Sequence, residues 1–502
     1  MKKKILSVCT FLIVVCSSSF AQSHNFQYSA DDTVNNFSSY SAVPLKGTGY
    51  EFLYFTADLN YDYNTYIQQL DSTGKASGAP INIGAPDSTQ GYAILQTADD
   101  GFIIGGDANT GTIQAFLIKT DNKGNIQWSN FYGPATNLTE YMFGLDITKD
   151  GGYVIAGYTS ASYYSSTQIF VARTDKQGDT LWTRTYGDTS LHGAATSIQS
   201  ASDGGFIITG YQISGSNNED IYILKIDSTG KKQWDNHFGG VNDDYGNFGK
   251  ETRDHGYIFA GEKALATNDN ETQSFIIKTD STGNASWGYL DTNYTSVVNG
   301  VTETSGGDFV AAGYDAVGVS DSVPVAENDA YLLKISSKGK RVWSTNPIKA
   351  TNPFKISDIL FTSFTSVSQT KDGGFLMPGI GSAYNNEKQP FGDALLVKTD
   401  SNGNISKSVA TGISQNISMV SNANITVYPN PFSAQTTIDI LNANLRNALL
   451  SIYDMNGNEV RHIENINSGI INIDRKSLIS GMYFYRLVNN GQMIGTGKLM
   501  AE

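Results

Sequence analysis

Short apolar stretches separated by polar turns run along most of the chain, and none of them keeps the 3.6-residue period of a helix. One representative segment has such stretches at residues 194–200, 205–211, 221–226 and 232–238. The third is apolar on both faces, which is typical of a strand covered by neighbouring sheets. Aspartate and glycine fill the turns and suit tight hairpins, because glycine accepts a positive φ. The pattern predicts a unit of four short strands.

The same unit recurs with a period of about 50 residues. Each copy has an aromatic residue beside a glycine-containing turn, and these aromatics are 52, 51, 53, 51, 52 and 66 residues apart: Tyr50, Phe102, Tyr153, Phe206, Tyr257, Phe309 and Phe375. A second turn, Asp-x-x-Gly or once Ser-x-x-Gly, follows in each copy. Seven copies of four strands predict an all-β fold, a seven-bladed β-propeller over residues 22–405. A solenoid or a row of separate small β domains is disfavoured, because about 52 residues without a disulfide rarely form a stable core.

All tryptophans of the chain stand four residues after the glycine of that second turn: Trp128, Trp182, Trp234, Trp287 and Trp343. The stretch from Asp227 through Gly230 to Trp234 resembles the tryptophan-docking motif of quinoprotein-like propellers. The resemblance implies that each indole packs against the next blade, and it does not imply the quinone. We therefore expect structural tryptophans and no cofactor.

The first 21 residues have the composition of a secretory signal peptide. Lys2, Lys3 and Lys4 precede an apolar run that ends before Ala21, and we expect cleavage between Ala21 and Gln22. Two alternatives are a membrane anchor, for which the run is short, and a lipoprotein modified at Cys16, which lacks the small residue before the cysteine. Removal of this segment removes both cysteines of the chain, so we expect a mature protein without disulfides or a transmembrane segment.

Charge narrows the choice of partners. The 502-residue chain has 34 basic and 48 acidic residues, a formal net charge of −14, and only 16% charged residues. An acidic protein repels the phosphates of nucleic acids, so nucleic acid is not an expected partner.

The last part of the chain has a different pattern. Residues 406–423 are rich in serine and asparagine and predict a linker. Alternating strands at 437–441, 449–453 and 482–488 predict a small immunoglobulin-like β-sandwich over residues 424–502.

Four motifs within this sandwich resemble the C-terminal type A sorting domain of the type IX secretion system. Their marker residues are Tyr428, Pro429, Asn430, Pro431, Gly481, Tyr483 and Lys498. The resemblance implies passage across the outer membrane, removal of the domain by a sortase-like peptidase, and release or attachment to surface lipopolysaccharide. An ordinary immunoglobulin-like binding module is the alternative.

Motifs for catalysis are absent from the sequence: there is no G-x-S-x-G, no H-E-x-x-H and no P-loop. The histidines are scattered over different units, which predicts no catalytic or metal role for them. The start of a calcium loop is resembled by four polar residues that alternate with apolar or aromatic ones: Asp58, Asn60, Asp62 and Asn64. The glycine that such a loop requires is missing. The sequence therefore leaves metal binding open. Asp243 and Asp244 are expected in a solvated loop.

Variable connections mark where a ligand is expected. The hairpins after the first and third strands are short and uniform, whereas the stretches 316–328, 346–364 and 380–392 depart most from the repeat. Tyr384, Phe391, Asp321 and Glu387 lie there, and aromatic rings beside carboxylates suit a sugar ring. The prediction is a secreted or cell-surface propeller that binds glycan or protein. The alternative is a polysaccharide lyase or hydrolase that uses carboxylates on this face.

Overall fold

A computed structural model describes residues 26–30, 36–57, 62–84, 88–133, 138–161, 166–187, 191–213, 218–265, 268–292, 295–319, 326–348, 359–384, 390–405, 424–441, 445–446, 448–453, 459–476, 478–489 and 492–502. All regular secondary structure in these ranges is β-strand, so the fold is all-β, as predicted. The chain divides into two compact units, Met1–Ala410 and Thr411–Glu502. The predicted signal peptide and linker lie outside the described residues.

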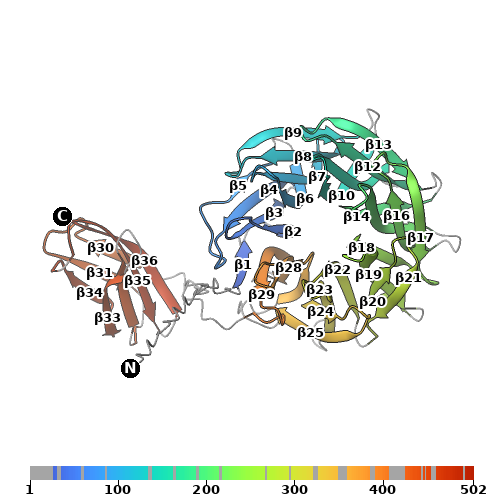
Figure 1. Ribbon diagram of the computed structural model, residues 1–502. Helices are drawn as coiled ribbons and strands as arrows, with labels where there is room; N and C mark the ends of the chain where they lie inside the picture. Colours follow the sequence, from blue (N-terminus) through green and yellow to red (C-terminus); the bar gives the residue numbers. More distant parts are fainter. Residues whose placement is uncertain are drawn as a thin grey trace, which may run out of the picture. The chain divides into compact units, whose positions relative to one another are not determined.

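The first unit contains five separate four-stranded antiparallel sheets that resemble propeller blades. In each sheet the strands pair in chain order, with the first strand toward the middle of the ring and the fourth at its rim (Figure 1). The sheets are β2 (Asn36–Pro44), β3 (Tyr50–Ala57), β4 (Tyr63–Leu70) and β5 (Ile81–Asn82); β6 (Ser88–Gln96), β7 (Phe102–Asn109), β8 (Ile113–Thr120) and β9 (Ile126–Tyr132); β10 (Thr139–Ile147), β11 (Tyr153–Ser160), β12 (Thr167–Thr174) and β13 (Thr180–Tyr186); β14 (Gly193–Ser200), β15 (Phe206–Ile213), β16 (Glu219–Ile226) and β17 (Lys232–Phe238); and β18 (Asp244–Glu251), β19 (Tyr257–Leu265), β20 (Asn268–Thr279) and β21 (Ala285–Leu290).

The remaining strands of this unit form a nine-stranded sheet. They are β1 (Phe26–Ala30), β22 (Ser296–Glu303), β23 (Phe309–Val319), β24 (Ala326–Ile335), β25 (Arg341–Ile348), β26 (Ile359–Phe364), β27 (Ser368–Gln369), β28 (Phe375–Tyr384) and β29 (Pro390–Thr399). A single parallel pair, Asn328 with Phe361, joins the group β22–β25 to the group β26–β29. The early strand β1 pairs with the late strand β29, from Phe26 opposite Lys398 to Ala30 opposite Ala394. This pairing ties the beginning of the unit to its end (Figure 1).

The core of this unit lies between neighbouring sheets. One cluster joins Val154 and Val171 of one sheet to Ile208 and Leu224 of the next. The second and third strands are buried on both faces, which explains their continuous apolar runs. A further cluster brings Phe52 of the β2–β5 sheet against residues of β28 and β29, so the first and last sheets also pack on each other.

Each tryptophan lies between two sheets, as the docking resemblance implies. Its ring contacts the aromatic residue that opens the second strand of the next sheet, in the pairs Trp128–Tyr153, Trp182–Phe206, Trp234–Tyr257, Trp287–Phe309 and Trp343–Phe375. The indole also covers the glycine of the next Asp-x-x-Gly turn: a Cβ on Gly283 would lie 2.7 Å from the Trp234 ring. Glycine is needed at these turns for two reasons. One is this close approach, and the other is a positive φ, which is +83° at Gly230 and +87° at Gly283.

A charge pair recurs beside the first turn. In the β14–β17 sheet the Nζ of Lys225 lies 2.8 Å from the carboxylate of Asp203, and the lysine side chain is only 2% exposed. Equivalent pairs are Lys119–Asp99, Arg173–Asp150, Lys278–Asp254, Lys334–Asp308 and Lys398–Asp372. A buried cation needs such a partner, so these pairs fix the turn against the third strand.

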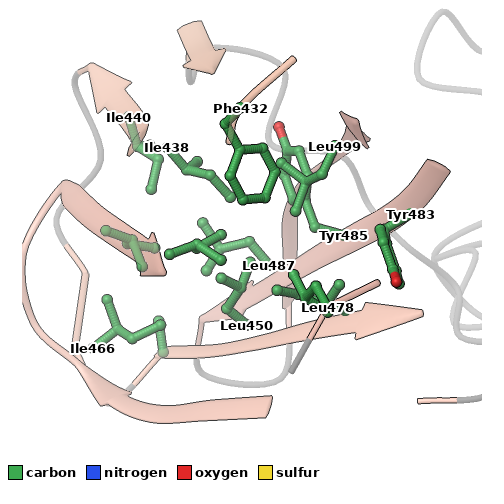
Figure 2. Packing of buried hydrophobic residues seen from close by; sticks show 14 of the residues in the cluster. Phe432, Ile438, Ile440, Leu450, Ile466, Leu478, Tyr483, Tyr485, Leu487 and Leu499 are labelled. Carbon is green, nitrogen blue, oxygen red and sulfur yellow. The ribbon is translucent and has the colours of Figure 1, made fainter. Parts of the chain in front are cut away.

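The second unit consists of two antiparallel sheets, β30 (Asn424–Tyr428), β31 (Gln435–Leu441) and β34 (Ile470–Asp474), and β33 (Glu459–Ile466), β32 (Ala448–Tyr453), β35 (Gly481–Asn489) and β36 (Gln492–Ala501). Both sheets contribute to one hydrophobic core, which contains Ile438 of one sheet and Leu450, Leu487 and Leu499 of the other (Figure 2). The three predicted strands in this part fall within β31, β32 and β35.

The variable stretches differ from the prediction in one respect. Strands β23 and β24 extend into 316–328, β25 and β26 into 346–364, and β28 and β29 into 380–392. These stretches were predicted as variable connections because they depart most from the repeat. Backbone pairing between adjacent strands continues into these stretches. In β28 and β29, for example, it reaches Tyr384 and Pro390.

Candidate functional site

The innermost strands share an irregularity that the sequence analysis missed. In β6, β10, β14, β18 and β22 one extra residue forms a β-bulge: Tyr92, Phe143, Thr196, Asn247 and Asn299. In β2 the irregularity spans Ser39 and Tyr40. Bulges redirect side chains and are frequent beside functional sites.

A glycine on the second strand accompanies each bulge. A Cβ on Gly106, Gly157, Gly210, Gly261 or Gly313 would lie 1.8 to 2.1 Å from a carbonyl oxygen of the innermost strand. The backbones therefore approach so closely that no other residue fits. These glycines stand four residues after the repeated aromatic, and that spacing is the signal from which the bulges could have been predicted.

On one side of the ring the bulge residues are polar and hold neighbouring sheets together. Thr196 Oγ1 donates to the Gly246 carbonyl at 2.6 Å, and Asn247 Nδ2 donates to the Val298 carbonyl at 3.1 Å. Asn299 Nδ2 donates to the Phe364 carbonyl at 2.8 Å. Because these polar groups are engaged by backbone, their arrangement is explained by structure alone.

On the other side the bulge residues are aromatic, and they begin what we call the aromatic arc: Tyr40, Phe55, Tyr63, Tyr92, Tyr141, Phe143 and Tyr158. Successive rings are in contact. Centroid distances are 5.8 Å for Tyr63–Phe55, 6.0 Å for Phe55–Tyr40, 5.3 Å for Tyr40–Tyr92, 5.5 Å for Tyr92–Phe143, 6.0 Å for Phe143–Tyr158 and 4.7 Å for Tyr158–Tyr141. The arc crosses three sheets, and Tyr40 and Phe143 are 38% and 37% exposed.

A buried carboxyl group adjoins the arc. Asp107 of β7 is 4% exposed, and its Oδ1 has no hydrogen-bond partner among the described residues. Burial, the larger effect, raises the pKa of Asp107 to about 7, although a hydrogen bond with Tyr92 lowers it. Burial is the larger cause of the raised pKa of Tyr40 and of Tyr92, and the negative charge of Asp107 raises both further. A carboxyl held partly protonated near neutral pH can both donate and accept hydrogen bonds.

The residues predicted to face a ligand are only partly described. Tyr384 ends β28 and Phe391 lies in β29, where it pairs with Ala383, so the two belong to one hairpin. Asp321 and Glu387 lie outside the described residues. Asp244 corrects an expectation, since it begins β18 and is 1% exposed instead of lying in a solvated loop. Its burial raises the pKa to about 6, although Lys263 acts to lower it.

Metal ligands and membrane-spanning helices were also sought in the described ranges. These ranges contain no group of three His, Cys, Asp or Glu side chains arranged to hold a metal ion. No helix long and apolar enough to cross a membrane occurs in them either.

In the second unit the predicted sorting motifs come together at one edge. The Asn430 side chain bridges to the last strand: its Nδ2 donates to the Lys498 carbonyl at 2.8 Å, and its Oδ1 accepts from the Met500 amide at 2.7 Å. Tyr483 pairs with Leu499 and Gly481 with Ala501. Tyr428 and Lys498 are exposed.

Comparison with known proteins agrees with this second unit. Residues 426–502 match the family described as the secretion system C-terminal sorting domain. That domain indicates a protein handled by the type IX secretion machinery and secreted or carried on the outer-membrane surface. The comparison with curated proteins found no match.

Solved structures similar to the chain share little sequence with it. Puromycin hydrolase is 13% identical with a TM-score of 0.39, covering 71% of this chain, which spans about half (51%) of that protein. Sqt1 of Chaetomium thermophilum is 11% identical with a TM-score of 0.43, covering 76% of this chain and 98% of that one. The subtype N11 neuraminidase-like protein of A/flat-faced bat/Peru/033/2010 is 11% identical with a TM-score of 0.36, covering 62% and 96%.

Proposed function

We propose that the first unit is a seven-bladed β-propeller that binds glycan outside the cell through the aromatic arc. The nine-stranded sheet is counted as two blades, β22–β25 and β26–β29 with β1, because strand pairing connects the two groups only at Asn328 and Phe361 among the described residues. In this count β1 is the outer strand of the last blade and closes the ring.

The observation that carries the proposal is the exposure of Tyr40 and Phe143 within a continuous chain of rings. Aromatic faces stack on the apolar face of a sugar ring, while nearby carboxyl groups hydrogen-bond its hydroxyls. Asp107 supplies such a group beside Tyr92. Tyr384, Phe391, Asp321 and Glu387 are proposed to extend the same ligand-binding face.

The domain limits belong to the same proposal. Residues 1–21 are a signal peptide cleaved between Ala21 and Gln22, 22–405 the propeller, 406–423 a linker, and 424–502 an immunoglobulin-like sorting domain. A sortase-like peptidase removes the last domain, and the propeller is released or attached to lipopolysaccharide.

Binding to a panel of polysaccharides tests the ligand class, with turnover measured separately. Tyr40→Ala and Phe143→Ala are expected to weaken glycan binding about tenfold each, which corresponds to about 1.4 kcal/mol for a lost stacking partner. Phe131→Ala is the matched control, because Phe131 is 44% exposed on the outer strand β9. Equal losses for all three variants would contradict a site at the arc.

Hydrolysis is the second candidate, and the raised pKa of Asp107 favours it, because a glycosidase needs a carboxyl that stays protonated near neutral pH. Product formation that disappears in Asp107→Asn would establish it. Binding without turnover, retained in that variant at reduced affinity, supports the binding module.

A further inference from the structure

Two joints have no tryptophan, the one between the last strands and the β2–β5 sheet and the one between the β2–β5 and β6–β9 sheets, and the second of these contains a pocket. The β6–β9 sheet presents the usual docking partners, Phe102 and Gly124, toward the β2–β5 sheet. In β8–β9, Leu117 pairs with Asn130 and Lys119 with Trp128. Strands β4 and β5 pair Ile67 with Ile81, and Gly78 stands four residues after the turn glycine Gly74, where other sheets have tryptophan. The indole is therefore absent from this joint.

A pocket of about 240 Å³ lies at this place. Its buried wall is formed by Glu51, Ile67, Phe102 and Gly124, and its exposed rim includes Ala79, Asn122 and Lys123. Ile81 also borders the pocket and is 39% exposed; its Cδ1 would lie 2.7 Å from a Cβ on Gly124, so this side chain covers part of that glycine and leaves an apolar edge at the rim. A cavity of about 150 Å³ can hold benzene, and this pocket has room for a two-ring aromatic group.

The carboxyl group of Glu51 sets this joint apart. At the equivalent position of the other repeats the residue is apolar: Ile103, Val154, Ile207, Ile258, Val310 and Leu376. Glu51 is 3% exposed, and no hydrogen-bond donor reaches its carboxyl among the described residues. The cation of the neighbouring charge pair is missing too, since Gln69 occupies the position of Lys119.

The joint also keeps an acceptor for an indole N–H. Elsewhere Trp182 Nε1 donates to the Ser228 carbonyl and Trp287 Nε1 to the Ser337 carbonyl, each at 3.1 Å. Both acceptors are the second residue of the Asp-x-x-Gly or Ser-x-x-Gly turn, and Asn122 is that residue in the β6–β9 sheet.

We propose that this pocket binds an indole-sized aromatic amine, with the ring on Phe102 and Gly124, the ring N–H on the Asn122 carbonyl, and the ammonium on Glu51. The ligand supplies both elements that the repeat has lost here, the indole and the cation. Burial raises the pKa of Glu51 to about 8, and an arriving ammonium stabilises the ionised carboxylate that burial disfavours. This site is separate from the glycan proposal, since its residues lie outside the aromatic arc.

Calorimetric titration of the full chain with tryptamine and with indole tests the assignment. Tryptamine is expected to bind at least tenfold more tightly than indole to the native protein. In Glu51→Gln tryptamine loses that advantage while indole binding is unchanged, because the shape of the pocket is kept. The control Asp243→Asn, which changes an exposed carboxylate, leaves both affinities as they were.

A second variant, Ala79→Trp, places an indole at a residue that lines the pocket and is expected to abolish binding of both probes. Its thermal unfolding midpoint shows whether it is folded, and Glu51→Gln stands alone as the test if it is not. Tryptamine binding of native strength in Glu51→Gln, or no binding of either probe to the native protein, overturns the proposal. Either result leaves glycan binding at the arc unaffected.

Discussion

The indole nitrogen of Trp182 donates a hydrogen bond of 3.1 Å to the backbone carbonyl of Ser228, which belongs to the next sheet along the chain. The same indole lies against Phe206, the aromatic residue that opens the second strand of that sheet. One side chain thus fixes the next sheet through a polar and an apolar contact. This pair of contacts explains how sheets without disulfides or long connections keep their order.

Trp182→Ala is expected to lower the free energy of unfolding by about 2 kcal/mol. This is less than the ~3–5 kcal/mol of a fully buried tryptophan, because the indole is half-buried. Trp182→Phe keeps a ring against Phe206 but loses the hydrogen bond, so a loss of about 1 kcal/mol is expected. Urea unfolding followed by circular dichroism measures both. Unchanged midpoints in both variants would mean that the docking contact does not stabilise the fold.

The repeated charge pairs predict loss of stability in acid. Partial burial alone would raise the pKa of Asp254, but hydrogen bonds from Thr252 and Lys278 outweigh it and lower the pKa to about 2. A carboxyl whose folded pKa is lowered stabilises the fold above its unfolded pKa, about 4, and loses that contribution as the pH falls toward 2.

The urea midpoint is therefore expected to fall between about pH 4 and pH 2, and less steeply in Asp254→Asn. Asp254 is 67% exposed, so solvent screening keeps the effect of one pair small. Lys278, by contrast, is 8% exposed. Lys278→Met removes this buried cation, so the folded protein no longer needs the Asp254 carboxylate to balance its charge. A pH profile of Asp254→Asn as steep as that of the native protein would contradict the assignment.

Strands, turns and tryptophan docking could be predicted because each depends on residues close together in the sequence. Asp227 and Gly230 specify their turn locally: Asp227 Oδ1 accepts from the amides of Thr229 and Lys231. The pairing of β1 with β29 could not be predicted, because the short segment Phe26–Ala30 meets a partner at the far end of the unit.

The aromatic arc was missed for a different reason. Tyr92 and Phe143 stand in innermost strands where alternation would send them to a sheet face, and only the bulge turns them toward each other. The site was predicted instead on the longest connections, at Tyr384 and Phe391. Connections that vary in length lie on a surface that tolerates insertions. The arc depends instead on which residue type occupies a constant position of the repeat.

Glu51→Ile is expected to stabilise the first unit at neutral pH. Burial raises the pKa of Glu51 to about 8 from about 4.5, so the folded state resists ionisation that the unfolded chain permits. The cost to folding is absent below about pH 4.5 and grows as the pH rises toward 8. At pH 7 it is on the order of 3 kcal/mol, from about 1.4 kcal/mol for each pH unit above 4.5.

Isoleucine matches Ile103 and Ile207 at this position of the repeat, so the variant also fills the joint with the expected side chain. Unfolding midpoints of native and variant protein are compared at pH 5 and pH 8, and the difference should be larger at pH 8. Glu262→Gln serves as the control, because burial raises the pKa of Glu262 as well but Glu262 lies away from the pocket. A gain independent of pH would show that packing, rather than ionisation, is responsible.

Removal of residues 424–502 is expected to abolish appearance of the protein outside the cell while leaving the first unit folded. The two units are separately compact, and the second has its own hydrophobic core, so neither needs the other for its packing. Within the second unit, Asn430→Ala removes the two side-chain hydrogen bonds that Asn430 makes with β36, and a partial loss of export is expected. Lys476→Ala is the matched control and should be exported normally, because the Lys476 side chain is 76% exposed and pairs with the nearby Asp474. Fractionation of cells and medium, followed by immunodetection of the first unit, measures all three. Export of the truncated chain at the native level would contradict a role for the sorting domain in its passage, and loss of export in Lys476→Ala would point to general instability instead of recognition.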